Sequence, residues 1–286
     1  MTIKEILQIS NRQVIQTEAE ILLAHLLDQK KSFLYAHPDY KLDPQQVWFF
    51  QKLLQRRLAG EPIPYITGHQ EFYGLDFLVD HNTFIPRPET EILVEWALER
   101  IKLFLNKKGK IVLADIGTGC GAICVTLAKL LKQKNNLNKV KFYAVEINQK
   151  SLLVARKNYQ RHQPLIPITF LLGNLLNPLP EKVDLILANL PYVKSTFFKR
   201  PSNKNYTRVY EPLEALNGGR DGLKLIKRLL KQSLTHLKRE GEILLEIDPR
   251  QANPLIKFTK QIFSQVEVTI KKDLSGLERV ILIRPM

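Results

Sequence analysis

The chain contains 286 residues with a mass of 33.1 kDa, which is enough for one large or two modest domains. Hydrophobic residues make up 44% and charged residues 25% of the chain, which excludes wholesale disorder. No run of about 18 apolar residues is available to span a bilayer, and the amino terminus lacks the apolar region and cleavage site of a signal peptide. The two cysteines are too few for a disulfide framework. We therefore expect a soluble cytoplasmic protein.

The charge balance is strongly basic. The 43 Lys and Arg residues against 28 Asp and Glu residues give a net charge of +15 and a pI of about 9.7. Such an excess is typical of proteins that bind nucleic acid, but lysines scattered over solvated faces produce the same total, so a nucleic-acid partner is possible and not required. Residues 194–208 carry five basic residues and no acidic one, which predicts a basic loop.

Residues 1–60 are predicted to form a helical domain. Thr17 is followed three residues later by Glu20, the spacing of a capping box, and a run of apolar residues comes next. Asp43 followed by Pro44 predicts the start of a further helix. Helices with apolar faces and no chemical motif are typical of a packing or partner-binding module, so we expect this domain to recognise a partner protein.

Residues 61–86 are predicted to form a linker, and residues 87–286 an α/β domain. The linker begins with the turn-rich stretch GEPIPYITG, and two short strands are expected around Gly74. Beyond it, helix and strand patterns alternate, which predicts a mainly parallel, doubly wound sheet. The expected strands are 111–115, 140–146, 168–172, 184–189, 242–247, 266–271 and 279–283, with the last two antiparallel. The expected helices are 88–105, one after 121, 149–159, 222–237 and 251–263.

A glycine-rich turn follows the first strand of this domain. Gly117, Gly119 and Gly121 lie between Asp115 and a helix, so backbone N–H groups can face a ligand there. A nicotinamide fingerprint has its third glycine one place later, which disfavours a dehydrogenase. Glu146 ends the next strand, where a carboxylate can accept the hydroxyls of a ribose. Together these features predict a site for an adenosine-containing ligand.

A further element of this site follows the third strand. Asn174 is placed to hydrogen-bond the edge of an adenine while Leu175 packs on the face of the ring. Taken alone, an ordinary asparagine turn is the simpler interpretation of this pair.

Asn189, Leu190, Pro191 and Tyr192 follow the fourth strand and carry the predicted chemistry. A planar nitrogen that attacks an electrophilic methyl group needs acceptors for its N–H groups and an aimed lone pair. The Asn189 side-chain oxygen is one acceptor, and the Leu190 carbonyl, held extended by Pro191, is the second. Tyr192 offers a flat face to a planar group. The tetrapeptide therefore predicts methyl transfer to an amide or amino nitrogen.

Other reaction classes find little support in the sequence. The six histidines form no H-x-x-x-H pair, and Cys120 and Cys124 have no partner ligands, so no metal is expected. Both cysteines are expected to pack as small apolar groups beneath the glycine turn. The chain has neither a G-x-S-x-G motif nor a P-loop lysine.

The sequence resembles the release-factor glutamine methyltransferases (the PrmC/HemK family) over nearly its whole length. The resembling stretches are GEPIPYITGHQEFYGLDF, FIPRPETEILVEWAL, ADIGTGCGAICVTLA, YAVEIN, NLPY, YEPLEALNGGRDGL, LLEI and DLSGLERV. The resemblance implies a Rossmann-like, seven-stranded methyltransferase domain preceded by a small helical domain and a β-hairpin linker. It implies S-adenosylmethionine as the cofactor, with no metal. The implied substrate is the glutamine of the GGQ tripeptide in bacterial class 1 peptide-chain release factors, methylated at its side-chain amide nitrogen (N5).

The resemblance also implies residue roles. Asn189 to Tyr192 would clamp the glutamine amide, and Phe84 would help to wall that pocket. The helical domain would recognise the release factor, and we expect the enzyme to be a monomer. The implied cofactor-binding residues are Asp115, Gly117, Thr118, Gly119, Cys120, Gly121, Glu146, Asn174, Leu175 and Asn189.

Four residues depart from the family's usual pattern. Leu190 replaces a proline and Asp248 a glycine, while Asn174 and Glu146 each replace an aspartate. Because the expected contact of Leu190 is its main-chain carbonyl, that contact can survive the replacement. Asn174 removes a charge beside the adenine, and Glu146 extends the carboxylate by one methylene.

Alternative substrates remain open at this point. A ribosomal-protein glutamine methyltransferase is the nearest alternative. Ribosomal RNA adenine methyltransferases share the NLPY form and suit the basic charge, but they typically carry their extra domain after the core, whereas the extra helices here precede it. A DNA adenine methyltransferase would need a target-recognition region, which is not visible. A non-catalytic binding module is disfavoured by the intact Asn189 and Tyr192.

Overall fold

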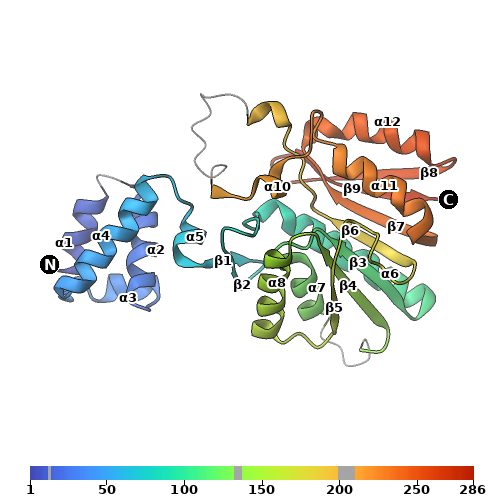
Figure 1. The fold of residues 1–286 in the computed structure, drawn as a ribbon. Helices are drawn as coiled ribbons and strands as arrows, with labels where there is room; N and C mark the ends of the chain where they lie inside the picture. The colour runs from blue at the N-terminus through green and yellow to red at the C-terminus, as the bar shows by residue number, and fades with distance from the viewer. Residues whose placement is uncertain (12–13, 132–136, 199–209) are drawn as a thin grey trace. The chain divides into compact units, whose positions relative to one another are not determined.

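The computed structural model describes residues 1–11, 14–131, 137–198 and 210–286. They form two compact units (Figure 1): residues 1–69 with Tyr210, and the described residues from 70 to 198 and from 211 to 286. No helix in these ranges is long and apolar enough to cross a membrane. The basic loop predicted at 194–208 lies outside the described residues from position 199 onward.

The first unit consists of helices around a small apolar core. The helices are α1 (Ile3–Ser10), α2 (Gln16–Leu26), α3 (Lys31–Ala36), α4 (Pro44–Leu58) and α5 (Ile63–Thr67). α2 packs against the other four. Its Leu22 and Leu23 are fully buried together with Phe50 of α4. The apolar spacing that predicted a helical domain therefore corresponds to one shared core.

The two predicted helix starts in this unit have different outcomes. The start at Asp43 is confirmed, because its side chain accepts a hydrogen bond from the Gln46 backbone N–H, and the Gln46 side chain accepts one from the Asp43 N–H. The capping box at Thr17 is wrong, since α2 already starts at Gln16 without a side-chain cap. Its expected partner, Glu20, is buried and accepts a hydrogen bond from the Gln16 side chain.

The predicted pair of short strands is present around Gly74. β1 (His69–Phe72) and β2 (Leu75–Leu78) form a two-stranded sheet, with Tyr73 and Gly74 at positive φ in the turn. β2 packs against α8 (Gln149–His162). The sequence before the strands is not all turn, because it contains α5. The domain boundaries at 60 and 86 stay predictions.

The second unit is built on a seven-stranded sheet with the order β5-β4-β3-β6-β7-β9-β8. The strands are β3 (Ile111–Ile116), β4 (Val140–Glu146), β5 (Ile168–Leu172), β6 (Val183–Ala188), β7 (Leu237–Glu246), β8 (Val266–Lys272) and β9 (Glu278–Pro285). The five from β3 to β7 are parallel, and β9 is antiparallel to both β7 and β8. The predicted seven-stranded α/β fold and its antiparallel final pair are confirmed.

Helices pack on the sheet in two groups. α6 (Glu91–Lys108), which follows the short 3-10 helix η1 (Pro88–Thr90), packs against α7 (Ala122–Leu130), and α7 against α8. α11 (Lys224–His236) and α12 (Ala252–Ile262) pack on each other beside β7, β8 and β9 (Figure 1). Alternate residues of β3, Val112, Ala114 and Ile116, share one core with α11 and α12, as the period of two in a strand requires. The shorter helices are η3 (Ser195–Phe197), α10 (Leu213–Leu216) and η4 (Pro249–Gln251).

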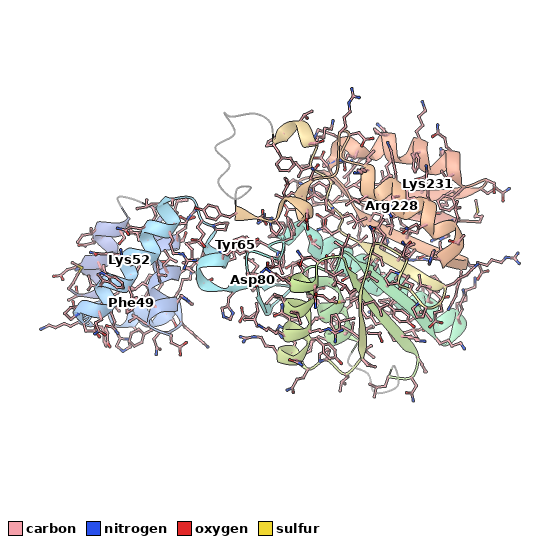
Figure 2. The ribbon with its side chains drawn as sticks, in the orientation of Figure 1. Phe49, Lys52, Tyr65, Asp80, Arg228 and Lys231 are labelled. Atoms are coloured by element: carbon pink, nitrogen blue, oxygen red, sulfur yellow. The ribbon has the colours of Figure 1, made fainter. Side chains whose placement is uncertain are left out.

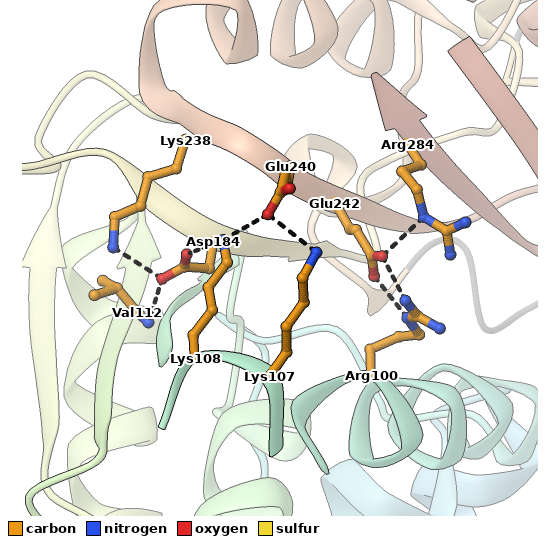
Figure 3. Close-up of polar contacts among 9 residues, drawn as sticks. All are labelled: Arg100, Lys107, Lys108, Val112, Asp184, Lys238, Glu240, Glu242 and Arg284. Atoms are coloured by element: carbon orange, nitrogen blue, oxygen red, sulfur yellow. Dashed lines mark hydrogen bonds and ion pairs between the residues drawn. The ribbon is translucent and has the colours of Figure 1, made fainter. Parts of the chain in front are cut away.

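Ion pairs brace the amino-terminal end of the parallel strands (Figure 3). Glu242 of β7 is 3% exposed and accepts two hydrogen bonds from Arg100 of α6, at 2.5 and 2.6 Å, and one from Arg284 of β9 at 3.0 Å. Asp184 accepts hydrogen bonds from the Val112 backbone and from the ammonium of Lys238. Each buried carboxylate at this end therefore has cationic partners, as buried charges require.

Candidate active site

The carboxyl ends of the parallel strands meet at one edge of the sheet. β3 lies between β4 and β6, and the register aligns Ile116 of β3 with Val145 and with Ala188. Glu146 and Asn189 directly follow these partners, and β5 ends beside β4. The topology therefore brings the four predicted elements to one edge, where ligands of open α/β sheets bind.

Three glycines with positive φ shape the turn after β3. The angles are +74° for Gly117, +57° for Gly119 and +85° for Gly121, a region that favours glycine. A Cβ on Gly121 would lie 3.2 Å from the Cβ of Ala155 in α8, so the turn sits tightly on that helix. A Cβ on Gly119 would meet nothing within 4 Å. This side of the turn is open to a ligand.

Asp115 is fully buried and only half satisfied. Its Oδ2 accepts a hydrogen bond of 2.6 Å from the Thr118 hydroxyl, while Oδ1 has no partner among the described residues. Burial raises the pKa of Asp115 to about 6, against the opposing effect of the Thr118 bond. An unpartnered buried oxygen of this kind is costly. A donor carried by a bound ligand would satisfy it.

Glu146, the predicted ribose ligand, is held by backbone amides. Its Oε2 accepts from the Gly119 N–H at 2.9 Å, and Oε1 from the N–H groups of Ile147 (2.8 Å) and Asn148 (3.0 Å). A carboxylate offers about four acceptor sites. Three of these sites are filled by amides, so a ribose that donates both of its hydroxyls would replace one amide. Of the three amides, that of Gly119 lies in the glycine turn.

The two residues predicted beside the adenine are placed differently. Leu175 has a positive φ of 54° and is 7% exposed, because its side chain belongs to the main core. Asn174 is half-buried, and its backbone carbonyl accepts from the Asn177 N–H. Asn174 therefore offers a ligand more accessible surface than Leu175 does.

Both cysteines are buried beneath the turn, as predicted. Burial raises the pKa of the Cys120 thiol to about 12, and the Cys124 thiol donates to the Gly121 carbonyl. Any contact between Cys120 and a cofactor must come from its backbone. Among the described residues, no three His, Cys, Asp or Glu side chains are grouped to hold a metal ion.

Asn189 belongs to a partly buried chain of hydrogen bonds. Its Nδ2 donates to the Thr90 hydroxyl at 3.1 Å, and that hydroxyl donates to Glu246 Oε2 at 2.6 Å. The Tyr192 hydroxyl donates to the other Glu246 oxygen at 3.3 Å. Burial raises the pKa of Glu246 to about 7, and burial together with Glu246 raises that of Tyr192. Thr90 and Glu246 lie in PRPETE and LLEI, stretches that carried the resemblance but had no predicted role.

The backbone of the tetrapeptide is also fixed. The Gln251 side-chain amide donates to the Tyr192 carbonyl at 2.9 Å. A Cβ on Gly222 would collide with that same carbonyl, and one on Gly218 with the carbonyl of Pro191. The NGGRDG stretch therefore needs its glycines so that it can lie directly against the loop.

Leu190 links this loop to the glycine turn. Its side chain is 4% exposed, and its Cδ2 lies 3.0 Å from the position that a Cβ on Gly117 would take. The leucine that replaces the family's proline thus packs its side chain against the glycine turn, and its carbonyl belongs to the backbone of the tetrapeptide.

Phe84, predicted to wall the substrate pocket, is held in place through Arg87 and the buried Glu211. The Arg87 guanidinium lies over its ring, 4.9 Å from the centroid, and donates to Glu211 Oε2 at 2.6 Å. Glu211, which is 4% exposed, also accepts from the Ile85 N–H at 3.2 Å. The position of Phe84 is therefore set by a residue 127 positions later in the chain.

Asn158 of α8 connects the hairpin to the glycine turn. It is fully buried; its Oδ1 accepts from the Leu78 N–H at 2.7 Å, and its Nδ2 donates to the carbonyls of Leu78 and Cys120, both at 2.9 Å. No local sequence signal marks this residue, because its partners lie 80 and 38 positions away.

Comparisons with known proteins identify the family. The PrmC N-terminal domain model matches residues 3–68, and a methyltransferase domain model matches residues 106–273. The release factor glutamine methyltransferase of Thermodesulfovibrio yellowstonii is 35% identical over 271 residues, covering 93% of this chain and 91% of that protein. The chain belongs to the release factor glutamine methyltransferases. The relatives from Rhodopirellula baltica and Bacillus subtilis are 35% and 32% identical and cover 92% and 93% of the chain, which spans 87% and 90% of those proteins.

Two solved structures have a fold similar to that of this release factor glutamine methyltransferase. The hMettl16 catalytic domain, in complex with MAT2A 3'UTR hairpin 1, superposes with a TM-score of 0.56 at 16% identity, over 91% of this chain and 90% of that one. A methyltransferase from Pyrococcus furiosus gives 0.50 at 19% identity, over 82% and 96%. At these identities the likeness concerns the fold alone.

Proposed function

We propose that the chain transfers a methyl group from S-adenosylmethionine to the side-chain amide nitrogen (N5) of the glutamine in the GGQ tripeptide of class 1 release factors. The proposal is carried by the contact of the Asn189–Tyr192 loop with the glycine turn, made by Leu190 on Gly117. An amide-binding loop and a turn suited to an adenosine cofactor thus adjoin at one sheet edge. Relatives named release factor glutamine methyltransferase support the choice of substrate.

The residues at the sheet edge fit S-adenosylmethionine. The open side of Gly119 admits the cofactor, and Glu146 is placed for its ribose. The unpartnered Asp115 Oδ1 suits a cationic donor such as the ammonium of its methionine part. Asn174 and Leu175 border the adenine. When bound, the cofactor supplies an electrophilic methyl group on a sulfonium.

The substrate amide is oriented by acceptors from the tetrapeptide. Because Asn189 gives Nδ2 to Thr90, its Oδ1 is left to accept one N–H of the glutamine amide. The Leu190 carbonyl accepts the other, and Tyr192 and Phe84 flank the plane. Positive charge that develops on the nitrogen is stabilised by these oxygens. The methyl–sulfur bond would break as the carbon–nitrogen bond forms, which would leave a neutral thioether, and the amide nitrogen would lose one proton to water.

The substrate assignment is tested by offering labelled S-adenosylmethionine with release factor, ribosomal protein, ribosomal RNA and DNA in parallel. We expect label on the release factor alone, and none on a release factor whose GGQ glutamine is replaced by alanine. Greater labelling of RNA, DNA or ribosomal protein would overturn the assignment.

The role of Asn189 is tested separately. In Asn189→Ala we expect cofactor affinity within a few fold of the unchanged enzyme and a transfer rate lower by about 10² or more, the scale of losing one positioned polar group. Calorimetric titration of the cofactor and timed methyl incorporation measure the two quantities. An undiminished rate rejects the clamp.

The helical unit is proposed to recognise the release factor. On α4, Trp48 and Phe49 are 53% and 52% exposed, with ring centroids 4.9 Å apart, and the Lys52 ammonium lies 5.3 Å from the Trp48 ring. Figure 2 labels Phe49 and Lys52 on this helix. Exposed aromatic rings beside a cation are typical of protein interfaces. Residues 3–68, which include α4, match the PrmC N-terminal domain.

This second role predicts a difference between substrates. Trp48→Ala combined with Phe49→Ala should raise the KM for whole release factor at least tenfold, the scale of losing interface anchors, and leave the KM for a short GGQ peptide unchanged. Leu274→Ala, at a fully exposed apolar residue of the second unit, serves as the control. Equal losses on both substrates would contradict the role.

A further inference from the structure

Two buried carboxylates lie on the same face of β7, four residues apart, but only one is paired with cations. Glu242 is bound by Arg100 and Arg284 (Figure 3). Glu246 is 2% exposed and is bound by two hydroxyls, those of Thr90 and Tyr192; among the described residues no Lys or Arg forms an ion pair with it. A buried carboxylate without a cation is costly. Because this free-energy cost lowers the stability of the protein, we look for a role of Glu246 in the site.

The direction of the hydrogen bonds follows from what each group can donate. An ionised carboxylate only accepts, so Thr90 gives its single hydroxyl hydrogen to Glu246. Thr90 can then only accept from Asn189, so the Asn189 amide must turn Nδ2 towards it, and Nδ2 lies 3.1 Å from the Thr90 hydroxyl. Because the two ends of an amide have nearly the same shape, packing alone selects between them poorly. The chain of hydrogen bonds makes the selection.

We propose that Thr90 and Glu246 are positioning residues that select the orientation of the Asn189 amide, so that its oxygen and not its nitrogen meets the substrate glutamine. This inference rests on the proposed function, because it takes Asn189 Oδ1 as the acceptor for the substrate N–H. Glu246 also receives the Tyr192 hydroxyl. One carboxylate thus orients both ends of the tetrapeptide.

Burial raises the pKa of Glu246 into the neutral range. Burial, the largest influence, and the nearby Glu89 raise its pKa, while hydrogen bonds from Thr90 and Tyr192 and the charge of Arg279 lower it, leaving it at about 7. A protonated Glu246 can donate to Thr90, which then no longer has to accept from Asn189. The orientation of the amide is therefore enforced above pH 7 and released below it.

Substitutions at Thr90 test the hydroxyl. Thr90→Val should lower kcat on release factor about 10²-fold, the cost of a misplaced group, with the cofactor Kd unchanged, and Thr90→Ser should restore kcat to within a few fold. Thr259→Val makes the same change at a fully buried threonine of α12, whose hydroxyl donates to the Leu255 carbonyl, and should leave kcat unchanged. A Thr90→Val enzyme with full kcat, or a Thr90→Ser enzyme as slow as Thr90→Val, would overturn the inference.

Substitutions on β7 test the carboxylate. The kcat of the unchanged enzyme should rise through about pH 7, whereas Glu246→Gln should be slow with no such rise. Glu242→Gln, the matched change on the same strand, should keep the rise. Without substrate, the melting temperature of the unchanged protein should fall relative to Glu246→Gln between pH 5 and 8, because the raised folded-state pKa costs stability once Glu246 ionises. A pH profile that survives Glu246→Gln would overturn the inference.

A double-mutant cycle separates this inference from the proposed function. If Thr90 acts through Asn189, adding Thr90→Val to Asn189→Ala should cause no further loss of kcat. Losses that multiply would overturn the inference and leave the proposed function standing. Full activity of Asn189→Ala on release factor would instead overturn the proposed clamp itself.

Discussion

Replacing Asn158 with leucine should destabilise the second unit severely. Leucine has the same branched shape but no polar atoms, so the Leu78 N–H and the carbonyls of Leu78 and Cys120 each lose their hydrogen bond. A buried backbone group left unsatisfied costs about 1–3 kcal/mol. Because Leu78 is only half-buried and water can reach it, we take the lower end for each group, about 3 kcal/mol in total. That is a large part of the stability of an ordinary domain.

The chain's two tryptophans allow the measurement to be confined to one unit. Trp48 is exposed on α4 and Trp96 is buried in α6. In a Trp48→Phe background, fluorescence during urea unfolding therefore reports on the second unit alone. Asn158→Leu should lower the midpoint strongly, and it should also weaken cofactor binding, because the released Cys120 carbonyl belongs to the glycine turn.

The control for this prediction is an exposed asparagine. Asn177 accepts one hydrogen bond, from Gln232, and Asn177→Leu should change the free energy of unfolding by no more than about 0.5 kcal/mol. If Asn158→Leu is as stable as Asn177→Leu, the hydrogen bonds of Asn158 do not hold the hairpin and the turn, and the reasoning is refuted.

Three further predictions concern the sheet and the glycine turn. Asp115→Asn should raise the free energy of unfolding at pH 8 by up to about 3 kcal/mol, because the folded-state pKa of Asp115, about 6, lies above the usual 3.8. This gain should vanish towards pH 4, and cofactor binding should be lost; calorimetry measures both. Gly117→Ala should weaken cofactor binding and slow transfer together, since the added methyl meets Leu190 at 3.0 Å in a left-handed backbone; an enzyme with only one defect contradicts this. Glu242→Gln should cost about 3 kcal/mol in urea unfolding by leaving Arg100 and Arg284 without their buried partner, while kcat stays unchanged.

The strands could largely be predicted because buried parallel strands are short apolar runs. Val140–Glu146 and Ile168–Leu172 have the predicted bounds. β7 begins five residues before the predicted Glu242, because Lys238 and Glu240 are polar and hide the start of the strand. Their charges are satisfied by Asp184 and Lys107, contacts that no local pattern reveals.

The grouping of the candidate site residues could be predicted where they directly follow strands. The glycine turn, Glu146 and the NLPY tetrapeptide belong to this class, and the sheet brings them to one edge. Thr90 and Glu246 could not be found in the same way, because the residues of that hydrogen bond are 156 positions apart. A single polar contact over such a separation leaves no periodicity in the sequence.

The packing of Leu190 on Gly117 has a consequence for engineering. Leu190, whose carbonyl is proposed to accept from the substrate amide, packs its side chain against the turn that is proposed to bind the methyl donor. A substitution at Gly117 that is selected for a new methyl-donor analogue will therefore also change the preference for the methyl acceptor. A library that varies Gly117 or Leu190 alone will contain few active enzymes.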